Sequence, residues 1–371
     1  MSEERNSYDV GILTFWNVPN YGTFAQAYAL QKFIHALNEK RDCKQIAYLN
    51  QRHFDFYYSR LPRCNPFHKT FYRDLWNRAF PFSQYYKKKR SFLESYKKIS
   101  HTKEMTAQEL EQAKFDTVVL GSDIIWDYSF EIFDKDPFLF GSKLNAKKKI
   151  SYAASFGTIK ESEPIPEYVK KSLLDMDEIS VRDLNSARIV EKIVGKKPEV
   201  VLDPTYLWDF TKDSNVIKPQ YEDYMVVYGQ DFSENSIKEI INYAKENKLT
   251  LICLDCNNDN YSWCDITVRQ CDLTPFEWIG YFRYAKTIAT TTFHGLTFSI
   301  IFNKKFAFCK TQFIMDKAGD FLKSIGLYEL FNKEKVTIKE MIDHDWNYSF
   351  INSKIEERRR ISIKFIEENI K

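Results

Sequence analysis

The chain has 371 residues, 44% of them hydrophobic and 28% charged, and this balance excludes a disordered protein. Because a single core rarely grows to such a length, we expect two domains. The net charge of +3 is small for the length and argues against a nucleic-acid partner. The charged first residues, the seven scattered cysteines and the lack of any run near the roughly 20 apolar residues of a membrane span predict a cytoplasmic protein with reduced thiols.

Short apolar runs alternate with polar or glycine-containing turns and helical stretches through most of the chain, which is typical of parallel α/β sheets. Residues 9–13 predict a strand, 14–22 a loop and 23–37 a helix with one apolar face. The alternation stops over residues 51–108, which are rich in aromatic and basic side chains. We favour a helical insertion with a solvated basic face there. The alternative is a surface that meets an anionic or lipid-linked substrate at a membrane.

Eight further strands are predicted, four in each half, at residues 115–120, 150–153, 178–181, 200–202, 224–228, 250–254, 287–289 and 305–308. The polar stretch 211–222 indicates a linker between the two sets, and 351–370 predicts a charged amphipathic helix. We therefore predict an α/β protein with two Rossmann-like lobes on parallel sheets. The lobes cover 1–210, insertion included, and 211–345, and a C-terminal helix follows over 346–371.

Polar motifs follow the predicted strands in both halves. Ligands of open parallel sheets bind outside the carboxyl ends of the strands, near helix N-termini, so we expect a cleft between the lobes. The first strand-to-helix loop forms either an ordinary turn or a set of backbone N–H groups and amides aimed at a bound anion. Its candidate substrate-binding residues are Asn17, Asn20, Tyr21 and Gly22.

Two more motifs of the first lobe come directly after strands. Ser122 and Asp123 follow the strand 115–120, where Asp123 is either the N-cap of a helix or a ligand of a sugar hydroxyl. Arg182 ends another strand. A lone Arg is usually part of a surface ion pair, whereas at a strand end that faces a cleft it suits a carboxylate or a phosphate.

His294 is the leading candidate for a catalytic residue. It stands on a predicted strand-to-helix turn, with Thr291 and Thr292 as candidate caps and Gly295 permitting close approach. A histidine at the positive end of a helix tends to stay neutral, which suits a general base near pH 7.

Four cysteines in the second half, at 253, 256, 264 and 271, have the spacing of a possible zinc site. Cys253 lies in an apolar run that predicts a buried strand, and free cysteine is among the commonest buried residue types. We therefore expect buried thiols there and no metal.

An ordered set of short motifs runs from about Gly11 to Leu327. The motifs are Gly11–Phe15, Asn20–Gly22, Gln26–Gln31, Gly121–Asp123 with Trp126, Ser151–Gly157, Val181–Asp183, Leu202–Thr205, and Phe293–Gly295 with Phe298 and Asn303–Lys304. In this order they resemble the polysaccharide pyruvyltransferase family. Each motif alone is weak, and the ordered set is specific.

The resemblance implies a two-lobed fold similar to GT-B glycosyltransferases, with the C-terminal helix packing back on the first lobe. It also implies transfer of the enolpyruvyl group of phosphoenolpyruvate onto two hydroxyls of a sugar, giving a cyclic pyruvate ketal and phosphate. Phosphoenolpyruvate would be the donor and no cofactor is implied. The acceptor would belong to a polysaccharide or its lipid-linked precursor, at the inner face of the membrane. By the resemblance, His294 is the base or acid and Arg182 an anion partner.

One position departs from the family pattern. Several members carry Arg two positions before this histidine, where this chain has Thr292. Thr291, Thr292, N–H groups at the helix N-terminus or Lys310 are candidates to bind the donor instead. Two other functions stay open: a GT-B-like glycosyltransferase that uses a nucleotide sugar, and a non-catalytic scaffold for polysaccharide assembly.

Overall fold

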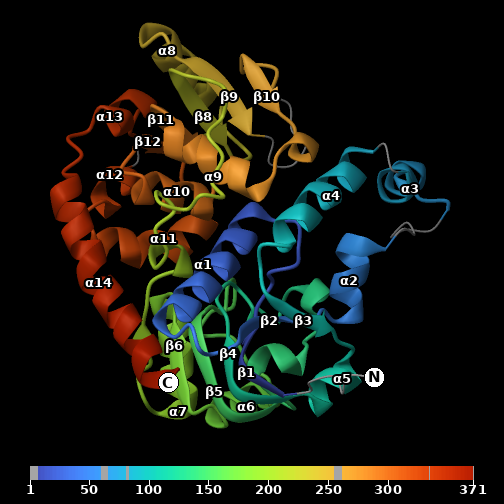
Figure 1. The fold of residues 1–371 in the computed structure, drawn as a ribbon. Coiled ribbons are helices and arrows are strands. Elements are labelled where there is room, and N and C mark those ends of the chain that lie inside the picture. Colours follow the sequence, from blue (N-terminus) through green and yellow to red (C-terminus); the bar gives the residue numbers. More distant parts are fainter. Residues whose placement is uncertain (1–6, 60–65, 81–82, 255–260, 334, 371) are drawn as a thin grey trace. The chain divides into compact units, whose positions relative to one another are not determined.

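The structure, a computed structural model, describes residues 7–59, 66–80, 83–254, 261–333 and 335–370 (Figure 1). The chain divides into two compact units, each with its own parallel sheet. The first unit comprises Met1–Arg63, Tyr96–Trp208 and Glu356–Lys371, and the second comprises Cys64–Ser95 and Asp209–Ile355. Residues 64–95, which the sequence placed in an insertion of the first lobe, group with the second unit.

The sheet of the first unit has seven parallel strands in the order β3-β2-β1-β4-β5-β6-β7. The central strands β1 and β4 pair over six residues each and are almost wholly buried along their second halves, as expected of a sheet covered on both faces. The strands are β1 Ser7–Leu13, β2 Cys43–Ala47, β3 His101–Glu104, β4 Lys114–Leu120, β5 Asn145–Ala154, β6 Glu178–Val181 and β7 Glu199–Val200.

Two apolar clusters fill the first unit. One joins β1 to α1 and includes Leu30, Phe33 and Ile34, and the other includes Val169 of α6 and Ile189 of α7. The unit thus has helices against its sheet in two separate cores, which is the doubly wound arrangement. Its helices are α1 Tyr21–Leu37, α2 Gln51–Tyr58, α5 Ala107–Gln112, α6 Glu167–Leu174 and α7 Leu184–Val194, with short 3-10 turns η1 Glu131–Phe133, η2 Pro137–Phe140 and η3 Pro204–Tyr206.

The C-terminal helix α14, Tyr348–Asn369, ends in the core of the first unit (Figure 1). Phe365 and Ile366 join the cluster that contains α1. Upstream on the same helix, Ser362 Oγ accepts the Leu202 N–H at 2.9 Å, and Arg359 donates to the Tyr206 carbonyl at 3.3 Å. The end of the chain is therefore tied to this unit by apolar packing and by hydrogen bonds.

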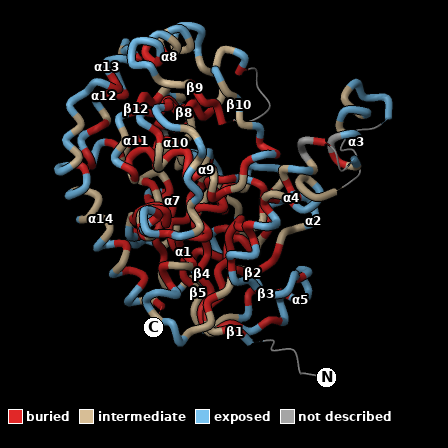
Figure 2. Tube along the Cα trace, turned by 45° about the horizontal axis from the view of Figure 1, so that its top comes forward, coloured by how far each residue is buried: buried red, intermediate tan, exposed pale blue. Residues whose placement is uncertain are grey.

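The sheet of the second unit has five parallel strands in the order β10-β9-β8-β11-β12. They are β8 Tyr224–Tyr228, β9 Thr250–Leu254, β10 Ile266–Val268, β11 Thr287–Thr290 and β12 Lys305–Phe308. The helices are α3 Phe71–Ala79, α4 Gln84–Tyr96, α8 Glu234–Glu246, α9 Pro275–Tyr284, α10 Phe293–Ile301, α11 Gln312–Ser324, α12 Tyr328–Asn332 and α13 Ile338–Ile342, with the 3-10 turn η4 Gln270–Asp272. The central strands are the most deeply buried, for example β8 and β11, which lie in the red part of the trace in Figure 2.

Two Rossmann-like units with parallel sheets confirm the predicted fold class. Three short strands, β2, β3 and β10, were not predicted, because their sequences lack a continuous apolar run. Among the described helices, none is both long enough and apolar enough to cross a membrane.

Candidate active site

The first strand-to-helix loop of the first unit positions its residues around the start of α1. Asn20 is the N-cap of that helix, and its side chain accepts the Thr23 N–H at 3.1 Å. Tyr21 and Gly22 form the first turn and are buried. The carbonyl of Asn17 accepts a hydrogen bond from the Tyr58 hydroxyl, while its amide oxygen is buried and has no hydrogen-bond partner among the described residues. Asn20 thus builds the turn, and the buried amide oxygen of Asn17 takes no part in it.

A buried polar network connects this loop to the end of β4. Thr14 Oγ1 donates to the Ser122 carbonyl at 2.9 Å and accepts from Gln26 Nε2 at 3.1 Å. Thr23 Oγ1 donates to Asp123 Oδ2 at 2.9 Å. Ser122 and Gln26 are fully buried, and Ser122 Oγ and Gln26 Oε1 have no hydrogen-bond partner within the described part of the chain. A buried polar atom left in this state costs about 1–3 kcal/mol, so both atoms favour a polar ligand or a water molecule beside them.

Asp123 is not the N-cap of a helix, and that interpretation of the sequence is wrong. The residue has a positive φ of 77° and pairs in a bridge with Ala154, and no helix begins at the residues that follow it. Its Oδ1 accepts the N–H of Ile124 at 2.8 Å. The carboxylate is therefore held between α1 and the end of β4.

Arg182 lies between two carboxylates at the carboxyl end of β6. Its Nη1 donates to Asp203 Oδ2 at 2.9 Å, and its Nη2 lies 3.9 Å from Asp123 Oδ1, with the arginine side chain only 6% exposed. Burial acts to lower the pKa of Arg182, and the charges of Asp203 and Asp123 outweigh that effect and raise it. The side chain therefore forms an ion pair, which is one of the two roles expected from the sequence. The pair is buried, however, and does not lie at the surface. The guanidinium holds the ends of the strands together, and its charge is already compensated.

In the second unit, three threonines build the turn between β11 and α10. Thr292 is the N-cap, and its Oγ1 accepts the Gly295 N–H at 3.0 Å. Thr290 Oγ1 accepts the Thr292 N–H at 3.1 Å, and Thr291 Oγ1 accepts the Gln230 N–H at 2.9 Å. Each hydroxyl thus receives a backbone N–H, so the turn is closed by side chains.

His294 is the second residue of α10, half-buried, with the Phe293 ring edge-on at a centroid distance of 5.2 Å. Gly295 beside it is required by space, because a Cβ at this position would lie 2.1 Å from Thr290 Oγ1. The imidazole is therefore carried on the first turn of a helix that follows a parallel strand, which is where open α/β sheets place ligand-binding groups.

Lys310 follows Cys309, whose N–H donates to the Thr290 carbonyl at 2.9 Å. The Nζ of Lys310 donates to the carbonyls of Asn332 and Lys333, at 2.9 and 3.2 Å. A cation on the last carbonyls of a helix is a favourable cap, here for α12. The ammonium therefore has a structural role already.

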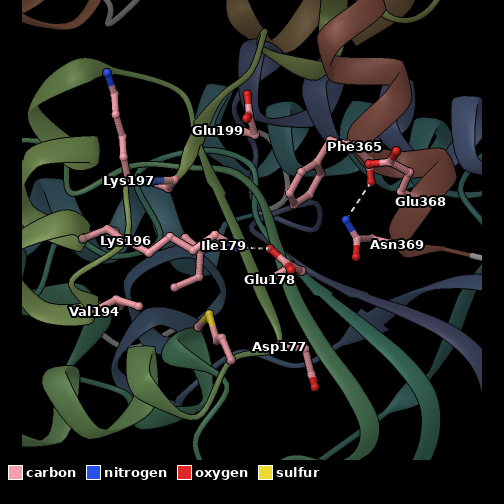
Figure 3. A pocket seen from close by; sticks show the side chains of 13 residues that line it. Asp177, Glu178, Ile179, Val194, Lys196, Lys197, Glu199, Phe365, Glu368 and Asn369 are labelled. Atoms are coloured by element: carbon pink, nitrogen blue, oxygen red, sulfur yellow. Dashed lines mark hydrogen bonds and ion pairs between the residues drawn. The ribbon is translucent and has the colours of Figure 1, made fainter.

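Two pockets in the first unit have volumes of about 390 and 400 Å³. They lie at the amino ends of the strands, whereas the predicted site residues follow the carboxyl ends. Figure 3 shows the first, lined at the amino ends of β6 and β7 by Glu178, Ile179 and Glu199, and by Phe365 of α14. The second is lined by the end of α1 and the start of β2. Neither includes a predicted site residue.

No group of three or more His, Cys, Asp or Glu side chains suitable for a metal ion occurs among the described residues. Cys253 and Cys271 are buried as expected, Cys264 is half-buried, and Cys256 lies outside the described residues. The prediction that no metal is used remains a prediction.

The two Rossmann-like units, each on a parallel sheet, define an α/β protein of the GT-B fold class. S. aureus MnaA, solved with UDP, is similar over 96% of this chain and 94% of its own, with 12% identity and a TM-score of 0.50. A putative UDP-N-acetylglucosamine 2-epimerase from Listeria monocytogenes is similar over 97% and 95%, with 8% identity and a TM-score of 0.50. The E. coli heptosyltransferase WaaC with ADP is similar over 83% and 90%, with 10% identity and a TM-score of 0.39. At such identities the likeness concerns the fold alone.

No curated protein sequence matches the chain. Residues 20–312 match the sequence profile of the family described as polysaccharide pyruvyl transferase, and the chain belongs to that family. The resemblance stated from the sequence motifs is thereby confirmed. The matched range begins at Asn20, so it includes the start of α1, Asp123 and the His294 turn, whereas Thr14 and Asn17 precede it.

Proposed function

We propose that the protein transfers the enolpyruvyl group of phosphoenolpyruvate onto two hydroxyls of a sugar, forming a cyclic ketal and releasing phosphate. The observation that carries the proposal is the position of His294, on the first turn of α10 directly after β11 and within the residues that match the family. The sugar would be part of a polysaccharide or its lipid-linked precursor. Phosphoenolpyruvate would be the donor, without a further cofactor or metal.

The proposed chemistry needs proton transfer at two stages. Protonation of the donor's C3 makes C2 electrophilic, and a sugar hydroxyl that gives up its proton attacks C2. A second hydroxyl then attacks the same carbon, loses its proton, and displaces phosphate to close the ring. The positive end of α10 disfavours a charged imidazole, so a neutral His294 would serve as the base.

The donor also carries a carboxylate and a phosphate that need partners. Thr292, which stands where several family members have Arg, is the N-cap of α10, and Lys310 is held by the end of α12. We therefore propose that the positive end of the α10 dipole, in place of that arginine, attracts one donor anion. In the first unit, we propose that Asn17 and Ser122 bind uncharged hydroxyl or amide groups of a ligand, since their buried oxygens are suited to hydrogen bonds.

The test measures phosphate released from phosphoenolpyruvate in the presence of a panel of free and lipid-linked glycans. We expect release with at least one acceptor and a fall of about 100-fold or more in His294→Ala, with little change in melting temperature. His344→Ala is the matched control, because His344 is exposed on a loop of the same unit. Equal turnover per folded molecule in His294→Ala would remove His294 from the mechanism.

A nucleotide-sugar glycosyltransferase is the second candidate, favoured by the likeness to a structure solved with UDP. Phosphoenolpyruvate and a UDP-sugar are added separately and the melting temperature is measured. Stabilisation by phosphoenolpyruvate supports the pyruvyl proposal. Stabilisation by the UDP-sugar alone would replace it, and stabilisation by neither, with no phosphate release, would favour a scaffold.

A further inference from the structure

Helix α3 of the second unit presents an aromatic stripe to the outside. Tyr72 and Trp76 are 75% and 52% exposed, and the C-cap residue Phe80 is 43% exposed. Positions 72, 76 and 80 are four residues apart and so lie along one face of the helix. The rings of Trp76 and Phe80 stack with centroids 4.6 Å apart. Figure 2 shows much of α3 in the pale blue of exposed residues.

The other face of α3 carries charge. Arg78 is buried, and its Nε donates to Asp74 Oδ1 at 3.1 Å. A helix that packs on a core normally turns its apolar side inward and its charges outward. Since α3 buries Arg78 and leaves Tyr72 and Trp76 exposed, its aromatic stripe is not explained by packing within the unit.

The same part of the sequence is strongly basic. Residues 66–95, which we call the aromatic-basic segment, contain seven Lys or Arg residues and two acidic residues, against a net charge of +3 for the whole chain. Arg73 is exposed on α3 beside the aromatic stripe, and Lys87 and Arg90 are exposed on α4, three positions apart. The segment thus combines exposed aromatic rings with an excess of positive charge.

We propose that the aromatic-basic segment binds the surface of an anionic lipid bilayer. Trp and Tyr favour the interface between lipid and water, because one part of each ring is apolar and the other forms hydrogen bonds. Lys and Arg beside them are attracted to lipid phosphates. A second copy of the chain fits less well, because two such segments facing each other would bring like charges together.

The test is sedimentation of the full-length protein with vesicles, with and without phosphatidylglycerol in phosphatidylcholine. We expect binding to the anionic vesicles, weakening as salt is added because salt screens the charges. Lys87→Gln with Arg90→Gln should lower the partition coefficient about 25-fold, since each basic residue near the surface contributes about fivefold. Tyr72→Ser with Trp76→Ser should lower it about tenfold or more.

Helix α6 supplies the matched control. Lys170 and Lys171 are exposed there, and Leu174 is 61% exposed, so Lys170→Gln with Lys171→Gln, and Leu174→Ser, remove the same kinds of group elsewhere. These variants should bind vesicles as the natural protein does.

Absence of binding by the natural protein, or an equal loss in the α6 controls, would overturn the proposal. The proposal would also be overturned if the protein formed a dimer in solution that Trp76→Ser dissociates, and if the natural protein did not bind to vesicles. The experiment needs no substrate, so its result is independent of whether the protein transfers pyruvyl groups.

Discussion

Replacing Gly295 with alanine adds one methyl group to the turn that carries His294, where the threonines leave no space for it. The new Cβ would lie 2.1 Å from Thr290 Oγ1 and 2.6 Å from Thr292 Oγ1. Thr292 Oγ1 also accepts the Gly295 N–H, so moving this hydroxyl away weakens the N-cap of α10. The substitution therefore acts on the packing and on the helix start together.

The expected change in the free energy of unfolding follows from two destabilising contributions and one stabilising contribution. Overpacking by one methyl group costs about 1–3 kcal/mol, and loss of an N-cap costs about 1 kcal/mol. Alanine is favoured over glycine in a helix by about 1 kcal/mol. The steric contributions prevail, and we expect Gly295→Ala to lower the free energy of unfolding by about 1–3 kcal/mol. Turnover per folded molecule should fall as well, because the displaced turn carries His294.

The assay is denaturant unfolding of Gly295→Ala beside Gly319→Ala. Gly319 lies within α11, where a new Cβ would have its closest contact at 3.3 Å with the Tyr328 ring. The control should be neutral or more stable by up to about 1 kcal/mol, as helix propensity predicts. Thr290→Ala removes the nearest clashing oxygen and should restore part of the stability in the Gly295→Ala background. Equal stabilisation by both glycine substitutions would refute the steric reasoning.

Three further substitutions test other contacts. Arg182→Met removes the guanidinium that faces the buried Asp203, and we expect unfolding measurements to show a loss of about 3–5 kcal/mol, part of it recovered by adding Asp203→Asn. Burial lowers the pKa of His53 to about 4, so between pH 6.5 and 4 the unfolded chain binds a proton that the folded chain does not, and stability falls as the pH drops through that range. His53→Phe should remove up to about 3 kcal/mol of this acid sensitivity in unfolding curves measured across that pH range, and an unchanged pH profile would contradict it. Lys310→Met should cost about 0.5–1 kcal/mol through the lost cap of α12 and leave the KM for phosphoenolpyruvate unchanged, whereas a large rise in KM would place Lys310 at the donor.

The sequence by itself determined the fold class and the location of the loops that connect β1 to α1 and β11 to α10. Strand β8 is a continuous apolar run and β4 ends in one at Val118–Leu120, because both are covered on both faces there, so they are visible without the structure. The edge strand β3 has the polar sequence His-Thr-Lys-Glu and carries no such pattern. The turn at His294 was predicted correctly, because an N-cap threonine and a following helix are contacts between near neighbours in the chain.

Only the tertiary structure decided what the charged candidates contact. Arg182 meets Asp203 twenty-one positions away, and Lys310 meets the carbonyl of Asn332 twenty-two positions away. Asp123 faces Thr23 across one hundred positions of sequence. The type of a side chain determines which partners it can bind. Which partner it contacts depends on how the strands and helices pack together. For these residues the packing brought together groups that are far apart in the sequence.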